Sequence, residues 1–230
     1  GIHLRNAVRT GKSESGKLPF VSLTRYGPHV ASGYYQSGSA RATQVEALFR
    51  RIAGRYDLIN DIQSLGLHRL WKRRLIRMAA VRPGERALDL CCGTGDVTFA
   101  LAAAGARATG LDFTRAMLDE AERRRVAAGL GEVEFVQGDA LNLPFADGTF
   151  GVVTISYGLR NLADFERGLR EMRRVLAPGG RLLVLDFGKP SNALWRAFYF
   201  GYLRLCVPVY GRVFAGDWAA YAYILDSLKQ

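Results

Sequence analysis

The chain has 230 residues, of which 49% are hydrophobic and 23% charged, and its formal net charge is +11. This length is enough for one α/β domain with a sizeable core. Three cysteines are too few for a disulfide framework, and no apolar run approaches the roughly 20 residues that a transmembrane helix needs. The positive charge indicates an anionic partner, either nucleic acid or acidic lipid, although a generally basic surface explains it equally well.

The amino-terminal part of the chain divides into an arm and a helical region. Residues 1–43 are basic, rich in Gly and Ser and without a sustained hydrophobic period, so we expect a poorly ordered arm. An organelle transit peptide is an alternative interpretation. Residues 44–82 predict two amphipathic helices, the first capped by Thr43 and the second covering Leu67–Ala80. The second helix is basic, which indicates either a solvated face or contact with anionic lipid. Its basic residues are Lys72, Arg73, Arg74 and Arg77.

A glycine-rich loop follows the most apolar segment. The run Ala87–Cys92 ends at Gly93–Gly95, and a helix-compatible run over Val97–Ala104 follows directly. This order predicts a buried parallel strand, a tight turn and a helix start. The two glycines let the backbone bend sharply and approach a ligand, and the helix N-terminus offers unpaired N–H groups.

The acid that ends the next predicted strand, Arg107–Asp112, indicates a nucleoside ligand, because its carboxylate can accept hydrogen bonds from both ribose hydroxyls. A dinucleotide fingerprint requires a third glycine three residues after Gly95, and Thr98 stands there instead. Asp89 followed by Gly-x-Gly is typical of S-adenosylmethionine (SAM) methyltransferases. The glycine loop alone favours the two cofactors about equally, and it could also serve only a tight turn.

Strands and helices alternate through the rest of the central region. Predicted helices cover Ala116–Ala128 and Asp164–Leu176, and predicted strands cover Val133–Gln137, Val152–Ser156 and Arg181–Phe187. Pro178–Gly180 is interpreted as the stop of the second helix. The alternation predicts an α/β fold with a doubly wound, mostly parallel sheet, whose ligands lie at the carboxyl ends of the strands.

The last part of the chain is dense in aromatic side chains. Residues 191–230 predict either a helical pair packed on the sheet or, equally, a wall for a large apolar substrate or a lid that rests on a membrane. We therefore expect a methyltransferase domain over residues 44–230. Its parts are a helical lid (44–82), a cofactor-binding core (83–190) and the aromatic segment (191–230).

Six segments together carry a family resemblance: Tyr56–Asp61, Leu67–Trp71, Leu88–Asp96, Leu143–Phe145, Ile155–Asn161 and Pro178–Leu182. They resemble the ubiquinone/menaquinone biosynthesis C-methyltransferases, which comprise the demethylmenaquinone and 2-polyprenyl-6-methoxy-1,4-benzoquinol methyltransferases. The resemblance covers about residues 45–227. The Gly-Leu-Arg-Asn element at 158–161 is more specific than the glycine loop, which all SAM methyltransferases share.

The resemblance implies the Rossmann-like fold of class I SAM methyltransferases, with amino-terminal helices and a helical insertion after the fifth strand. Family members continue through a further helix and an antiparallel hairpin, so we expect the carboxyl-terminal hairpin to be missing after Gln230. SAM is the implied cofactor, and the histidines and cysteines show no metal-ligand spacing. The implied cofactor-binding residues are Asp89, Gly93, Thr94, Gly95, Asp112, Asp139, Ala140 and Ser156.

The same resemblance implies the individual roles. Thr94 and the backbone of its neighbouring glycines would hold the methionine end, Asp112 the ribose, and Asp139 with Ala140 the adenine edge, with Ser156 beside the cofactor. Three residues would serve catalysis: Arg160 and Asn161 face the quinol, and Tyr56 closes the pocket.

The implied reaction is C-methylation of a reduced polyprenyl quinol. The ring carbon ortho to a hydroxyl becomes nucleophilic as that hydroxyl loses its proton. Arg160 suits stabilisation of the phenolate, directly or through a water, because its guanidinium stays charged. The alternative for Arg160 is a structural salt bridge at a strand end.

Two other functions stay open. Methylation of another substrate, such as nucleic acid, fits the charge, but the Asn-Pro-Pro-Tyr type element that grips a flipped base is absent after the fourth strand. The second alternative function is that of a non-catalytic module that binds SAM or serves assembly. The expected partners are a polyprenyl quinol and an anionic membrane surface, not nucleic acid, with a homodimer or biosynthetic complex as a further expectation. The expected location is the cytoplasm at the inner face of the membrane, or the organelle matrix in a eukaryote.

Overall fold

The computed structural model describes residues 60–61, 64–186, 192, 194, 198–199 and 201–202. The expected arm (1–43), the helix that begins after Thr43, the catalytic candidate Tyr56 and most of the aromatic segment (191–230) lie outside the described residues. The expected domain limits therefore stay predictions. Within the described ranges, no helix is long and apolar enough to cross a bilayer.

Five parallel strands form one sheet in the order β3-β2-β1-β4-β5. The strands are β1 (Arg86–Leu90), β2 (Arg107–Asp112), β3 (Glu134–Gln137), β4 (Phe150–Ser156) and β5 (Leu176–Leu185). Strand β1 pairs with both β2 and β4, so β2 and β3 lie on one side of β1 and β4 and β5 on the other. The strand order therefore reverses between β1 and β4. Ligands of open α/β sheets bind at such a reversal, beyond the carboxyl ends of the strands. The predicted doubly wound parallel sheet is confirmed.

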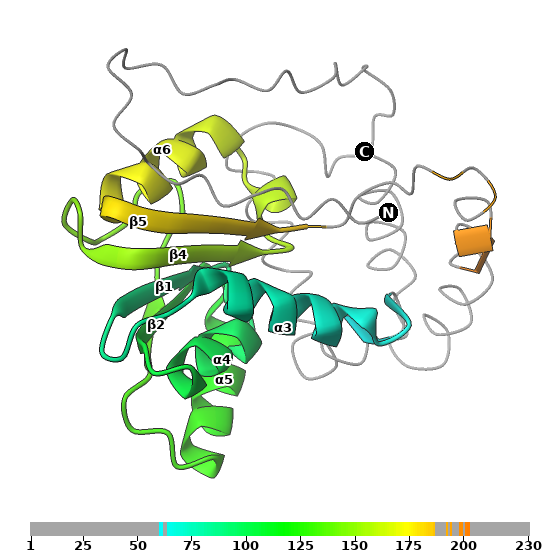
Figure 1. Cartoon of the computed structure of the whole chain (residues 1–230), viewed down its shortest axis with the longest axis horizontal. Coiled ribbons are helices and arrows are strands. Elements are labelled where there is room, and N and C mark those ends of the chain that lie inside the picture. Colours follow the sequence, from blue (N-terminus) through cyan, green and yellow to red (C-terminus); the bar gives the residue numbers. More distant parts are fainter. Residues whose placement is uncertain are drawn as a thin grey trace.

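Helices cover both faces of the sheet (Figure 1). One face carries α3 (Leu67–Ala79), α4 (Asp96–Ala103) and α5 (Arg115–Ala127), and the other carries α6 (Phe165–Val175). A short 3₁₀ helix, η3 (Leu159–Asn161), follows β4.

The central strands are buried on both faces, which explains their nearly continuous apolar sequences. Ala87 of β1 belongs to the core under α3 and α4, together with Leu75 and Leu101. The next residue, Leu88, belongs to the core under α6, together with Met172. Successive residues of a strand point to opposite faces, so each central strand contributes to both cores and is held at a fixed register.

Two predicted strand boundaries are wrong. The strand expected to reach Cys92 ends at Leu90, because Cys91 has a φ of 52° and leaves the extended conformation. Strand β5 begins at Leu176, before the Pro178–Gly180 segment that the sequence pattern predicts to be a helix stop. That segment forms an irregularity within the strand, where the pairing with β4 shifts register and Gly179 adopts a φ of 76°.

Candidate cofactor-binding site

The loop between β1 and α4 has a backbone shape that depends on its two glycines. Gly93 and Gly95 have φ values of 55° and 89°, and Gly95 is the N-cap residue of α4. A Cβ on Gly95 would lie 2.9 Å from ring atoms of both Phe99 and Phe135, so no side chain fits there without displacing these rings. The predicted order of strand, tight glycine turn and helix start is thus confirmed.

The carboxylate of Asp112 fixes this loop from the neighbouring strand. Asp112 is the last residue of β2, and its two oxygens accept hydrogen bonds of 2.8 Å from the backbone N–H groups of Gly93 and Thr114. Burial raises the pKa of Asp112, although these hydrogen bonds oppose the shift. Each carboxylate oxygen can accept more than one hydrogen bond, so the group can also receive the hydroxyls of a ligand.

A cavity opens at the carboxyl ends of β1, β2 and β4. The described residues that line it include five predicted cofactor residues and one of the three predicted catalytic residues: Gly93, Asp112, Asp139, Ala140, Ser156 and Asn161. The predicted residues Asp89, Thr94, Gly95 and Arg160 do not line this cavity. The hydroxyl of Ser156 is buried and has no hydrogen-bond partner within the described part of the chain. A buried polar atom of this kind is normally satisfied, so a bound molecule is the natural partner. The Asp112 carboxylate can accept the ribose hydroxyls, the Ser156 hydroxyl can bind a ligand, and the backbone at Gly93 allows close approach. Together these groups fit a nucleoside cofactor.

Asp89 lies behind the loop and is only 1% exposed. Its two oxygens accept hydrogen bonds of 2.8 Å from the hydroxyls of Thr98 in α4 and Thr154 in β4. Burial raises the pKa of Asp89 to about 6, against the effect of these two hydroxyls. The geometry therefore gives Asp89 a positioning role: it ties α4 and β4 to the strand that carries the loop.

The ends of β1 and β4 approach each other closely at the cavity. Cys91 and Tyr157, which follow these two strands, both adopt left-handed backbone conformations with φ values of 52° and 60°. A Cβ on Gly158 would lie 2.4 Å from the Cβ of Cys91, so only glycine permits this approach. Non-glycine residues in this region of φ are strained, and such strain gathers at functional sites.

Arg160 lies in η3 and pairs with Asp186, the residue directly after β5. The ion pair predicted as the alternative role of Arg160 is thus present, and it joins the carboxyl ends of β4 and β5. Asn161 follows Arg160, donates a hydrogen bond of 3.3 Å to the Tyr157 carbonyl and lines the cavity. Sequence reasoning missed Asp186, whose place after a strand at this same edge of the sheet is the signal that could have found it.

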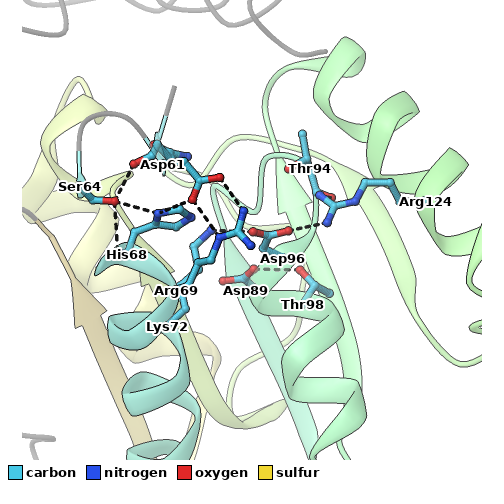
Figure 2. A network of polar contacts seen from close by, with 11 residues as sticks. Asp61, Ser64, His68, Arg69, Lys72, Asp89, Thr94, Asp96, Thr98 and Arg124 are labelled. Atoms are coloured by element: carbon cyan, nitrogen blue, oxygen red, sulfur yellow. Dashed lines mark hydrogen bonds and ion pairs between the residues drawn. The ribbon is translucent and has the colours of Figure 1, made fainter. Parts of the chain in front are cut away.

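A polar network on the other side of the loop was also missed (Figure 2). Asp96 accepts hydrogen bonds from the Lys72 ammonium at 2.8 Å and from the Arg124 guanidinium at 2.6 Å. Burial raises the pKa of Asp96, but the two cations outweigh it and hold that pKa below its usual range. Lys72 belongs to the basic helix interpreted as a solvated or lipid-facing surface, yet its side chain is 13% exposed. Arg73, Arg74 and Arg77 of the same helix are exposed.

The described residues hold no group of three or more His, Cys, Asp or Glu side chains that could bind a metal ion. Burial raises the pKa of the Cys91 and Cys92 thiols well above their ordinary value, so neither is a thiolate at neutral pH. The polar groups that the described part of the site offers to a ligand are carboxylates, hydroxyls, amides and guanidinium groups.

Comparisons with known proteins agree with this geometry. Residues 37–230 match the sequence model of the ubiE/COQ5 methyltransferase family. The ubiquinone/menaquinone biosynthesis C-methyltransferase UbiE of Cereibacter sphaeroides is 42% identical over 193 residues, which cover 83% of this chain and 77% of that protein. The protein of the same name from Ectopseudomonas mendocina is 45% identical over 196 residues, which cover 83% of this chain and 76% of that protein.

A solved structure is similar as well. The YcgJ protein from Bacillus subtilis is 30% identical and superposes with a TM-score of 0.50, covering 58% of each chain. Its likeness extends over the Rossmann-like α/β core that class I methyltransferases share. The strand order, the glycine loop and the match over most of the length lead to one assignment: the chain belongs to the ubiE/COQ5 methyltransferase family.

Proposed function

We propose that this protein is a SAM-dependent methyltransferase that adds a methyl group to a ring carbon of a polyprenyl quinol. The reaction converts demethylmenaquinol to menaquinol, or is the 2-polyprenyl-6-methoxy-1,4-benzoquinol step of ubiquinone synthesis, or both. One observation carries the proposal. A single cavity joins Asp112, at the end of β2, to Asn161, within the Gly-Leu-Arg-Asn element after β4. The names of the relatives at 42% and 45% identity support the substrate class.

The cofactor side of the cavity is organised around Asp112. S-adenosylmethionine supplies an electrophilic methyl group on a sulfonium. In this proposal Asp112 accepts the ribose hydroxyls, the backbone at Gly93 receives the methionine end, and Asp139 with Ala140 contacts the adenine edge. The buried Ser156 hydroxyl gains a partner on binding. Asp89, Thr94 and Gly95 act beneath this surface by holding the loop in shape.

Arg160 directly precedes the cavity-lining Asn161 and does not itself line the cavity, and in this proposal it stabilises charge on the substrate. Deprotonation of a quinol hydroxyl makes the ortho carbon nucleophilic, and negative charge develops on the oxygen. The Arg160 guanidinium stabilises that phenolate, directly or through a water that takes the proton. Asp186 holds the guanidinium in place through their ion pair, so Arg160 need not reorganise during the reaction. Asn161 contacts the quinol from the cavity wall, and Tyr56, which lies outside the described residues, is proposed to close the pocket.

The surface around the start of α3 supports docking on a membrane, where a polyprenyl tail resides. Leu65, Leu67 and Leu70 are 49%, 38% and 55% exposed, and Arg73 and Arg74 are exposed on the same helix. Apolar side chains flanked by cations suit peripheral binding to anionic lipid. We propose that the protein works in the cytoplasm at the inner face of the membrane, or in the organelle matrix of a eukaryote, as a homodimer or within a biosynthetic complex.

Two experiments test these proposals. Deletion of the gene should cause accumulation of a quinone that is lighter by one methyl group, measured by mass spectrometry of lipid extracts. An unchanged quinone profile would contradict the proposed function. Flotation with liposomes should show binding that increases with anionic lipid and decreases with salt, and binding independent of both would contradict membrane docking.

A further inference from the structure

Arg124 of α5 binds the glycine loop (residues 93–95) and the first residue of α4. The Arg124 guanidinium donates through Nη1 to the backbone carbonyl of Thr94 at 3.0 Å and through Nη2 to the Asp96 carboxylate at 2.6 Å. A planar guanidinium has donors in a fixed fork, so one side chain can hold the loop backbone and the first residue of α4 together. Figure 2 shows Arg124 reaching across to both residues.

The contact with Thr94 fixes one peptide plane. The carbonyl of Thr94 and the N–H of Gly95 belong to the same peptide unit, which is planar. The carbonyl accepts from Arg124, and the N–H donates to the Cys92 carbonyl at 3.0 Å. A peptide next to glycine can rotate at low steric cost, because glycine tolerates both signs of φ. Rotation of this peptide would break both hydrogen bonds, so Arg124 opposes it.

The surroundings of Arg124 keep it in this position. Its guanidinium carbon lies 5.6 Å from the centroid of the Phe99 ring, which packs edge-on against Phe135. The Asp96 carboxylate, which lies 2.6 Å from Arg124, also accepts from Lys72 through its other oxygen. Its negative charge is further favoured at the N-terminus of α4. The anion is therefore shared by cations from α3 and α5, on either side of α4.

The network extends along α3 toward the segment that precedes this helix. Arg69 pairs with Asp61 at 2.5 Å, and the Ser64 hydroxyl lies 2.9 Å from Nδ1 of the buried His68. These contacts join the segment just before α3 to the helix that supplies Lys72. Figure 2 shows the polar side chains following one another from Asp61 to Arg124.

We propose that Arg124 is a positioning residue for cofactor binding: with Asp96 and Lys72 it clamps the Thr94–Gly95 peptide and keeps the glycine loop in the shape that receives SAM. The inference rests on the proposed function only in that the bound cofactor is SAM. Arg124 does not line the cavity, so its effect passes through the loop backbone. Loss of the clamp therefore weakens cofactor binding and leaves the methyl-transfer step itself unchanged.

The test compares Arg124→Met with Arg123→Met in the full chain. Arg123 is the neighbouring residue on the same helix, its side chain is 72% exposed, and it pairs with Glu120 within that helix. Isothermal titration with SAM should give a Kd about 10-fold or more higher for Arg124→Met, the loss expected for charge-assisted hydrogen bonds, and an unchanged Kd for Arg123→Met. The kcat at saturating SAM should stay within about 2-fold of wild type.

Two further readouts separate a clamp from a general structural role. Arg124→Lys should give an intermediate Kd, because an ammonium cannot bind the carbonyl and the carboxylate with fork geometry. Hydrogen exchange of the Gly95 amide should accelerate in Arg124→Met while exchange in β4 stays unchanged.

Three results would overturn the inference: an equal SAM Kd for Arg124→Met and Arg123→Met, a loss of kcat as large as the loss of affinity, or faster exchange throughout the sheet. A wild-type protein that binds SAM but methylates no quinol would instead overturn the proposed function. The titration and the exchange measurement would still decide the clamp, since neither uses a quinol.

Discussion

At the scale of single residues, the burial of Asp89 makes the stability of the folded protein depend on pH. Its carboxylate is buried between two threonine hydroxyls, and its pKa in the folded protein is about 6, above the 3.8 of an exposed aspartate. The folded state therefore binds this proton more tightly than the unfolded state does. Stability from this group is fully present below pH 4 and is lost as the pH rises through 6, a loss of about 3 kcal/mol.

Asp89→Asn should remove this dependence. The new amide can accept from Thr98 and donate to Thr154, so the variant keeps two hydrogen bonds without a buried charge. Urea unfolding at several pH values should show that wild type gains stability relative to the variant as the pH falls from 7 to 4. A difference between the two proteins that stays constant over this range would contradict the assignment of the shifted group to Asp89.

Arg160 is the residue whose replacement should affect turnover most selectively. Arg160→Ala removes the cation that we propose stabilises the phenolate, so kcat should fall about 100-fold or more, while the SAM Kd stays near wild type. Arg167→Ala is a suitable control, since Arg167 is an exposed residue of α6. Equal losses of turnover and SAM affinity for Arg160→Ala would refute its catalytic role and favour a purely structural ion pair with Asp186.

At the scale of elements, the hydrophobic pattern of the sequence predicts the strands and helices whose limits depend on local burial. Strands β1 and β4 are predictable because both faces are buried and their sequences are nearly continuous apolar runs. The entry into β5 is not, because Pro178–Gly180 is typical of a helix stop and only the pairing with β4 makes it part of a strand. The end of β1 is also set non-locally, since Cys91 bends away where Gly158, in the turn after β4, approaches it.

One arginine joins elements that are distant in sequence, and its loss should destabilise the fold. Arg181 of β5 donates to the Ala79 carbonyl at the end of α3 and pairs with Glu85 at 2.6 Å, with both charged side chains about 15% exposed. Arg181→Met should lower the free energy of unfolding by about 2–3 kcal/mol, because it leaves a mostly buried carboxylate and helix-end carbonyl without their donor.

Chemical denaturation measures this effect, with Arg107→Met as the control. Arg107 is an exposed arginine at the first position of β2, and its replacement should change stability by less than about 0.5 kcal/mol. Equal effects of the two substitutions would show that the link between α3 and β5 contributes nothing specific.

At the scale of the whole molecule, parallel topology makes much of the site predictable. The carboxyl ends of parallel strands share one edge, so residues that end β1, β2 and β4 meet without knowledge of the strand order. This argument places Gly93, Asp112 and Ser156 around one cavity. The partnership Asp96–Arg124 could not be predicted, because it joins α4 to α5 and the distance between these helices depends on how they pack on the sheet. The same holds for Lys72, which the helical pattern placed on a basic surface and which packing against α4 turns inward.

Transfer of a labelled methyl group is the measurement that tests the central claim most directly. The purified chain would be incubated with methyl-labelled SAM and either demethylmenaquinol or the methoxybenzoquinol, each in reduced and oxidised form, and the label would be located by mass spectrometry. The account predicts label on a ring carbon of a reduced quinol and none on the oxidised quinone, which cannot form a phenolate. Label on a quinol oxygen, equal labelling of the oxidised form, or no labelling of either quinol would contradict it.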